Sequence, residues 1–335
     1  MTPRSSICLA SAFFLLFAAG ASPIAAGAPE PSAEIGQAST AAAISARIEI
    51  FDRDLQRLRR FMGASEAGEL DIGIRSTLPR DLYSQALTLW QQTDRLSFEV
   101  MRVHATPPPP PAGDIGLPDV LRRLEDANRI LRRVMEELKI PSDSEPPPER
   151  KTPVADPFTA ILHLNRQLNL LLERHLAPRD VYMEVTLAIG YAARLLSRYP
   201  EANRIPAEPP FEPDKQPGDV HLRLIECLRS VSRILDTLGL PAPQINTSRV
   251  EPNKLVPGDV FLVAATIVSQ LDFLHKYLGI ARTPPQPIYP GLRFPAHTYQ
   301  RTGILGAQLT QLERFLATDR AAFGKIEHDA NSSKR

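Results

Sequence analysis

The pentapeptide Pro257-Gly258-Asp259-Val260-Phe261 opens a long, strongly apolar segment, and variants of it open four other segments of the chain. Proline fixes φ and lacks an N–H group, so it fits the first turn of a helix, where a carboxylate accepts free backbone N–H groups. We interpret each copy as a helix start. In the Gly-Asp copies the aspartate is expected at the N-cap, whereas in the Arg-Asp copies it fits the first turn equally well. The other copies are Pro79-Arg80-Asp81-Leu82-Tyr83, Pro118-Asp119-Val120, Pro178-Arg179-Asp180-Val181-Tyr182 and Pro217-Gly218-Asp219-Val220-His221.

The aspartates of these copies recur at a nearly constant spacing. Asp81 and Asp119 are 38 residues apart, Asp180 and Asp219 are 39 apart, and Asp219 and Asp259 are 40 apart. A unit of that length holding one helix buries its apolar face only by packing on neighbours, as in repeat proteins. The alternative, a set of ligand or metal sites at the five aspartates, is not needed, because capping alone explains the residue type and its position.

Eight segments carry apolar residues at every third or fourth position, which predicts an all-α protein of eight main helices. In the third segment, for example, Val120, Leu124, Ala127 and Leu131 form one apolar stripe. The fifth and seventh segments are apolar nearly all round, so we expect them to be the most buried. The predicted helices span 40–62, 79–103, 119–138, 157–176, 178–199, 219–238, 259–278 and 297–317.

Proline makes up 33 of the 335 residues, and the prolines lie outside the predicted helix interiors. The proline-rich connections are long enough to cover about 50 Å, whereas a 20-residue helix spans ~30 Å. Each connection is therefore able to run back along a helix, and the sequence leaves the helix directions open. Only the link at 177–179 is short enough to require an antiparallel pair, the fourth and fifth helices.

That short link divides the chain into two sets of four helices, 29–177 and 178–317. Asp219 follows Asp81 by 138 residues and Asp259 follows Asp119 by 140, so the second set repeats the first at a similar offset. We predict two homologous halves that arose by internal duplication. The polar tail, 318–335, is expected to be disordered.

Residues 1–28 have the features of a cleavable export signal. Arg4 precedes an apolar run at 7–21, and small residues place cleavage after Ala21, Ala26 or Ala28. The run is shorter than the ~20 residues needed to span a bilayer, and no later stretch is expected to span one. The mature chain would keep one cysteine, Cys227, because Cys8 lies in the signal. We expect a buried, unreactive thiol there.

No local motif indicates catalysis, a cofactor or a metal, so the sequence predicts no catalytic, cofactor-binding or metal-ligating residue. The nearest approach to a metal pair is Asp272 and His275, three residues apart on one helix, for which a local hydrogen bond or ion pair is the simpler interpretation. An enzyme site assembled from several helices would require buried ionisable groups such as His163, His221 or His275 to cluster. The net charge of +1 gives no reason to expect nucleic acid as a partner.

Two surface features are able to bear a binding function. Phe211, Tyr289 and Phe294 lie in proline-rich connections, where they would either bind a partner or, as we prefer, pin the connections to the bundle. The third helix is rich in arginine, but acidic residues alternate with the arginines, which favours an ordinary solvated face over an anion site. The arginines are Arg122, Arg123, Arg129, Arg132 and Arg133.

The sequence therefore predicts an exported, periplasmic or secreted helical-repeat protein that acts by binding. The first hypothesis is an interaction or scaffold protein of the cell envelope with a polypeptide partner, because helical repeats offer broad surfaces. The second is a carrier of a small apolar ligand, which would need a cavity beside the fifth and seventh helices. The third is an enzyme with a non-local site.

Overall fold

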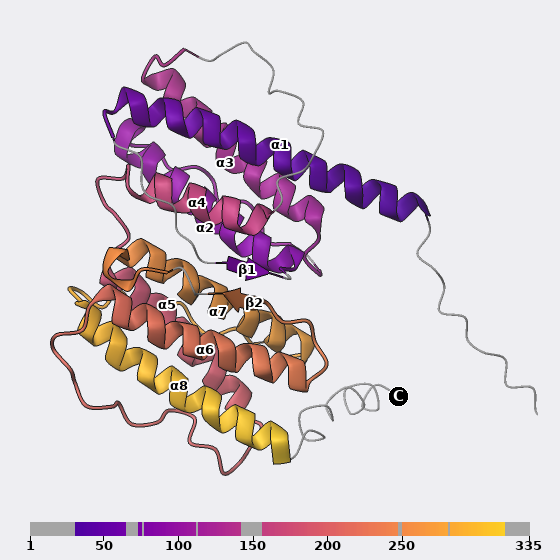
Figure 1. Cartoon of the computed structure of the whole chain (residues 1–335), viewed down its shortest axis with the longest axis vertical. Coiled ribbons are helices and arrows are strands. Elements are labelled where there is room, and N and C mark those ends of the chain that lie inside the picture. Colours follow the sequence, from indigo (N-terminus) through magenta and orange to yellow (C-terminus); the bar gives the residue numbers. More distant parts are fainter. Residues whose placement is uncertain are drawn as a thin grey trace, which may run out of the picture.

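The computed structural model describes residues 31–64, 73–75, 77–111, 113–141, 156–246, 250–280 and 282–318. The predicted signal, 1–28, and most of the predicted tail, 319–335, lie outside this part. Within it the chain is all-α, with eight α-helices and one pair of very short strands (Figure 1). The helices are α1 (Pro31–Phe61), α2 (Pro79–Met101), α3 (Leu117–Glu137), α4 (Pro157–Asn169), α5 (Pro178–Leu196), α6 (Pro217–Thr237), α7 (Pro257–Tyr277) and α8 (Pro295–Thr318); a 3₁₀ turn, η1, covers Pro252–Lys254.

The helices form two four-helix bundles, α1–α4 and α5–α8, stacked one on the other (Figure 1). In the first bundle α3 packs on α1 and α2, and α4 packs on the same two helices. In the second, α7 packs on α5 and α6, and α8 does likewise. Corresponding helix pairs therefore touch in both bundles, an arrangement that a duplication would produce. The duplication itself stays a prediction.

All four helices of a bundle point in the same direction. The first residues of α5, α6, α7 and α8 are Pro178, Pro217, Pro257 and Pro295, and all four line one small cavity. In the first bundle Arg47 and Asp54 of α1 contact Glu125 and Arg132 of α3 in the same order along both helices. Such a bundle requires the chain to return outside it after each helix, which is what the long connections do.

Parallel helices bring their positive ends together, and the five repeated aspartates lie at those ends. Each is the third helical residue, and its carboxylate accepts the backbone N–H of the residue before the helix at 2.7–3.0 Å. The Gly-Asp copies do the same as the Arg-Asp copies, so our placement of Asp219 and Asp259 at the N-cap is wrong by three residues. The carboxylates satisfy a free N–H and offset the aligned helix dipoles.

Four helices, α1, α3, α6 and α7, end in the same way, with a residue of positive φ followed by an apolar residue that folds back. The residues of positive φ are Gly63, Lys139, Gly239 and Gly279. The next N–H donates to the carbonyl five residues earlier, as in Ile140 to Met135 and Leu240 to Leu235. Gly239 and Gly279 are thus helix caps.

α4 is shorter than predicted and ends at Asn169 rather than at 176. The Asn169 side chain accepts the Leu176 N–H at 2.8 Å, while its backbone carbonyl contacts Nδ1 of His175 at 2.7 Å. The link to α5 therefore runs from Leu170 to Ala177. α4 and α5 do point in opposite directions, but they are not one of the main packed pairs.

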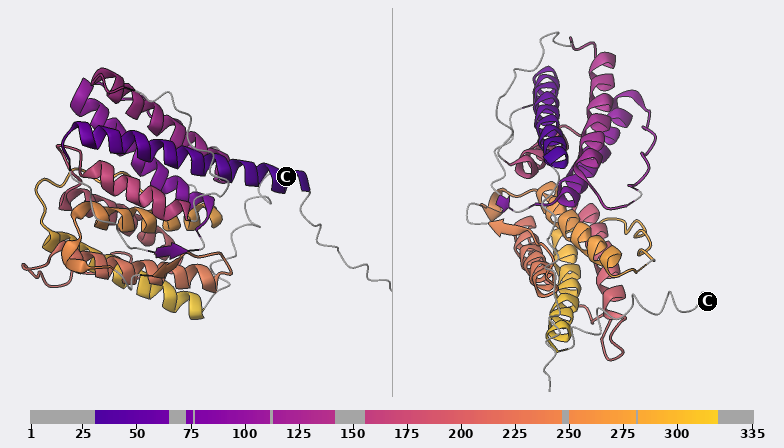
Figure 2. Two further views of the ribbon diagram at one scale, coloured as in Figure 1. Left: turned by 45° about the horizontal axis from the view of Figure 1, so that its top comes forward. Right: turned by 90° about the vertical axis from the view of Figure 1, so that its right-hand side faces the viewer.

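The two strands were not predicted. β1 (Gly73–Arg75) precedes α2 and β2 (Gln244–Asn246) lies between α6 and α7; they pair antiparallel with Ile74 opposite Ile245. This ribbon lies beside the junction of the bundles, as the right-hand view of Figure 2 shows. It joins the connection between α1 and α2 to the proline-rich connection between α6 and α7.

Three connections dock on helices at glycines. A Cβ atom at Gly190 would lie 2.9 Å from Pro284, one at Gly218 2.6 Å from the carbonyl oxygen of Pro252, and one at Gly303 2.6 Å from Pro209. The absence of a side chain lets each proline approach the helix backbone closely. The connections therefore do run along the helices.

The apolar side chains form one core cluster that extends through both bundles. As expected, α7 is among the most buried helices, with 13 of its 21 residues buried. The expectation for α5 is wrong, because 9 of its 19 residues are buried, a share no larger than the 10 of 21 in α6. By length and composition alone α7 is also able to cross a membrane, which differs from our expectation for the chain after the signal. However, 67% of its most apolar window is buried within the protein, as in the core helix of a soluble fold.

Candidate functional site

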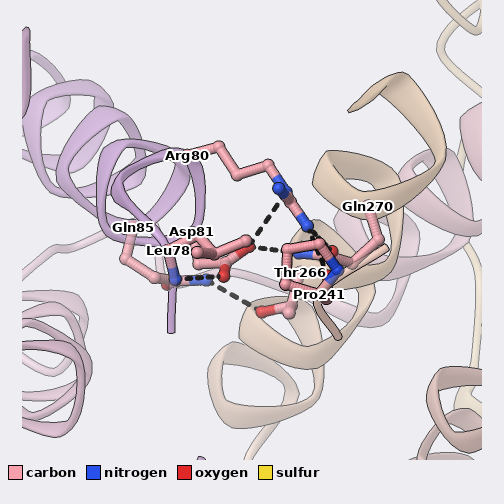
Figure 3. Close-up of polar contacts among 7 residues, drawn as sticks. All are labelled: Leu78, Arg80, Asp81, Gln85, Pro241, Thr266 and Gln270. Atoms are coloured by element: carbon pink, nitrogen blue, oxygen red, sulfur yellow. Dashed lines mark hydrogen bonds and ion pairs between the residues drawn. The ribbon is translucent and has the colours of Figure 1, made fainter. Parts of the chain in front are cut away.

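The bundles meet along α2 and α7, which run antiparallel and share buried polar side chains (Figure 3). Gln85 of α2 donates from Nε2 to the Thr266 hydroxyl at 3.1 Å, and Gln270 of α7 donates to the carboxylate of Asp81. All four of these residues are buried. A buried polar group without a partner is costly, so these matched pairs fix how one bundle sits on the other.

Arg80 lies at the edge of this polar seam and joins it to the surface. One guanidinium nitrogen donates to the Pro241 carbonyl at 3.0 Å and to the Gln270 amide oxygen at 3.2 Å. The guanidinium carbon lies 3.6 Å from the centre of the Phe273 ring. Arg80 is thereby held flat on α7, and its partial burial lowers the pKa of the guanidinium.

Two of the repeated aspartates have a second role at the seam. Burial raises the pKa of Asp81 and of Asp259, although each accepts a backbone N–H and lies beside an arginine. Asp259 forms an ion pair with Arg166 of α4 at 2.9 Å, and Asp81 lies 3.9 Å from Arg80. Capping explains the position of these residues, but it does not account for their contacts across the bundle interface.

A groove of about 420 Å³ opens beside Arg80, where the start of α2 meets the last turns of α7. Both bundles and two connections line it. Apolar walls come from Leu78, Pro79, Ile115, Pro241, Phe273 and Tyr277, and the charged groups at its rim are Arg80, Asp114, Asp272 and Lys276. Half of the Tyr277 side chain, 51%, is exposed there. The groove is thus suited to binding an apolar or aromatic group that is flanked by charge.

The groove holds no nucleophile with an activating base, and within the described residues no three histidine, cysteine or acidic side chains are close enough to hold a metal ion. Asp272 and His275 do not act as a metal pair. The Tyr191 hydroxyl donates to Asp272 at 2.9 Å, and Nε2 of His275 contacts the Tyr191 carbonyl at 3.0 Å. Both side chains therefore join α7 to α5, and the local ion pair of Asp272 is with Lys276 at 2.8 Å rather than with His275.

His163 and His221 do not cluster with Asp272 and His275. His163 contacts Gln167 one turn along α4, with 3.1 Å between the two nitrogens. His221 is fully buried in α6, and neither of its ring nitrogens has a hydrogen-bond partner in the described part of the chain. Its burial lowers its pKa to about 4. The cluster that an enzyme site would need is not formed by His163, His221 and His275.

The cavity that touches both α5 and α7 at their first turns measures about 10 Å³, less than one water molecule occupies in the liquid. The buried Cys227 also lies in this bundle, where loss of hydration raises the pKa of its thiol to about 12. Cys227 is therefore unreactive as a thiolate at neutral pH. Neither feature supports an apolar ligand between the first turns of these core helices.

The aromatic residues of the connections do contact the bundle, but only by one face. Phe211 and Phe294 pack on the His297 ring with centroids 5.1 and 5.8 Å away, and Arg179 lies over Tyr289 at 5.6 Å. About half of each ring is exposed: 48% for Phe211, 55% for Phe294 and 62% for Tyr289. They hold the connections in place and also present apolar surface.

The arginines of α3 do not all lie on one solvated face. Arg123 is buried and donates to the Tyr83 hydroxyl at 2.8 Å, and Arg132 pairs with Asp54 of α1 at 3.1 Å. Arg129, by contrast, is exposed and pairs with Asp126 on its own helix. Two of the five thus have structural partners on other helices, which their alternation with acids did not reveal.

Sequence signals for the groove were weak, because its residues come from segments about 190 positions apart. Comparisons of this chain with known protein families, with curated proteins and with solved structures found no match. The case for a function therefore rests on the chain's own geometry.

Proposed function

We propose that the protein is an exported, non-enzymatic interaction module of the cell envelope, and that it binds a polypeptide in the groove between α2 and α7. The observation that carries this proposal is the concave surface of about 420 Å³ formed jointly by the two bundles. Its half-exposed Tyr277 and its Phe273, held by Arg80, offer an aromatic anchor, and protein interfaces concentrate binding energy on such residues.

The chemistry of the rim supports a polypeptide rather than a purely apolar ligand. Charges of both signs surround the apolar walls, with Asp114 and Asp272 near Arg80 and Lys276. A partner would place one apolar or aromatic side chain in the groove and match these charges around it, as the polar rims of interfaces do.

Site-directed photocrosslinking in the organism that makes the protein tests this proposal. Benzoylphenylalanine at Tyr277 is expected to give one discrete polypeptide adduct, whereas the same residue at the exposed Arg129 of α3 is expected to give none. Ser269→Trp, which fills the groove, should abolish the adduct. Thr237→Trp, at an exposed turn of α6, should leave it unchanged. Identical adducts from both positions, or an adduct that survives Ser269→Trp, would contradict the proposal.

The export component is tested separately by sequencing the amino terminus of the mature protein from fractionated cells. Cleavage after Ala21, Ala26 or Ala28 and recovery outside the cytoplasm are expected. Recovery of the intact amino terminus in the cytoplasm would contradict it.

A further inference from the structure

A second cavity lies on the other side of α2, between α2 and α5, and has a volume of about 130 Å³. It is distinct from the groove at Arg80 and shares none of its residues. The volume equals that of roughly four waters at ~30 Å³ each, so it suits a very small ligand. Polar and charged side chains make up much of its lining, unlike the apolar core.

Glu184 is one of the residues that line this cavity. It is an acidic residue in the middle of α5, a helix that is otherwise largely apolar, and it has no hydrogen-bond or ion-pair partner among the described residues. Glu184 is half-buried and its carboxylate keeps some exposure to the cavity, while partial loss of hydration raises its pKa to about 7. A partner with a positive charge and N–H donors would supply what it lacks.

Among the other groups around Glu184, hydrogen-bond acceptors and donors are also unequal in number. Asp180 lies one turn earlier on α5 and already accepts the Ala177 N–H, while the amide oxygen of the buried Gln92 on α2 has no partner in the described residues. Asp180 adds a hydrogen-bond acceptor to the cavity, whereas the Gln92 oxygen is buried. On the α2 side Arg95 contributes a guanidinium, of which one nitrogen donates to the Arg174 carbonyl at 3.2 Å.

Apolar surface completes the cavity. Leu176, Met183 and Phe261 line it, and Phe261 is the residue that α7 contributes. The cavity therefore combines surplus acceptors, one cationic group and a small apolar wall. These are the complements of an ammonium group, a carboxylate and a short side chain.

We propose that this cavity is a binding site for the ammonium group of a small primary amine, with Glu184 as the counter-ion, and that a small α-amino acid is the ligand that also engages Arg95. The site is independent of the groove and of the polypeptide partner proposed above. An amino acid bound here would touch α2 of one bundle and α5 and α7 of the other, and so would stabilise their junction.

Calorimetric titration of the whole mature protein with L-alanine, ethylamine and propionate tests the assignment. L-Alanine and ethylamine are expected to bind and propionate is not, because only the first two carry an ammonium group. Glu184→Gln should weaken both by at least tenfold, whereas Glu226→Gln, at an exposed position on α6, should change neither. Arg95→Gln should weaken L-alanine but leave ethylamine unchanged.

The charge state of Glu184 provides a readout that a structural role alone would not give. Near pH 7 binding of ethylamine should release about half a proton, because the ammonium group favours the ionised carboxylate, and the measured enthalpy should depend on the buffer. Asp180, Arg95 and Tyr191 are the other ionisable groups near it. The proposal is overturned if neither amine binds at millimolar concentration, if propionate binds as well as L-alanine, or if Glu184→Gln leaves both affinity and proton release unchanged.

Discussion

The repeated aspartates are one residue type with two environments, and the difference is measurable. Asp219 accepts only the Gln216 N–H, whereas the buried Asp259 also pairs with Arg166. We expect Asp219→Ala to lower the free energy of unfolding by about 1 kcal/mol, the usual value of a cap. Asp259→Ala should lower it by about 3–5 kcal/mol, because it leaves the Arg166 charge partly buried without its partner. Urea unfolding at pH 7 measures both, and equal losses would show that the ion pair adds nothing.

His221 makes a prediction about acid stability. Its pKa is lowered to about 4 in the folded protein, below the unfolded value of about 6.5, so the unfolded chain binds the proton first. Stability linked to His221 is therefore complete above pH 6.5 and is lost as the pH falls toward 4, by up to about 3 kcal/mol. His221→Leu should remove this loss and be at least as stable as the wild type at pH 8, whereas His104→Leu, at an exposed position, should keep it.

Glu184 has the opposite dependence. Its pKa is raised to about 7, so the stability it contributes is present below pH 4.5 and is lost as the pH rises through 7. The side chain keeps some exposure to the cavity, so we expect a discounted effect of about 2 kcal/mol. His221 has the opposite dependence over the same range, so the test is the difference between variant and wild type: Glu184→Gln should gain about 2 kcal/mol of unfolding free energy relative to the wild type between pH 4.5 and pH 8. A difference between the two proteins that does not change with pH would contradict this.

At the scale of elements, the docking of a connection on α8 predicts opposite effects on stability for alanine substitutions at Gly303 and Gly306. A Cβ atom at Gly303 would lie 2.6 Å from the Pro209 ring, whereas one at Gly306 would lie 3.9 Å from Sγ of Cys227, an ordinary contact. Alanine is favoured over glycine in a helix by up to about 1 kcal/mol. Gly306→Ala should therefore raise the thermal midpoint, and Gly303→Ala should lower it by displacing the connection. If both raise it, the connection is not held at that point.

The helices were predictable because their starts are local. A proline lies at or next to each start, in most cases with an aspartate close by. Seven of the eight starts fall within two residues of the predicted positions, and the exception is α1, which begins at Pro31 rather than at 40. The burial of one polar stripe on α2 was not predictable in this way; its residues are Asp81, Gln85, Thr88 and Gln92. Their 4-3-4 spacing gives a polar stripe of the kind that normally faces solvent, yet all four are buried. Only the placement of the other bundle decides this, and that depends on contacts as distant as residues 81 and 270.

For the cavity at Glu184 a sequence signal did exist. Glu184 is the only carboxylate of α5 besides the capping Asp180, and a carboxylate within a largely apolar segment suggests a functional site. However, its neighbours Arg95 and Gln92 come from another helix in the other half of the chain, and no spacing rule connects them to Glu184. The residue was thus detectable, but its site was not.

At the scale of the whole molecule, the two bundles are joined by one apolar core and by the polar seam between α2 and α7. Each bundle contains one natural probe. Trp90, the only tryptophan, is buried in the first, and Cys227, the only cysteine after residue 8, is buried in the second. Because the core is continuous, we expect the bundles to unfold together, so that tryptophan fluorescence and thiol labelling give the same midpoint in urea.

Weakening the polar contacts between the bundles should separate the midpoints reported by Trp90 fluorescence and by Cys227 labelling. Arg166→Met removes the ion pair to Asp259 but keeps most of the apolar stem, so each bundle retains its own packing while the charge of Asp259 loses its partner across the interface. We expect the Trp90 and Cys227 midpoints to move apart in this variant. Arg233→Met, which removes an exposed pair to Glu313 within the second bundle, should leave them coincident. Separate midpoints already in the wild type would mean that the seam orients two independently stable bundles.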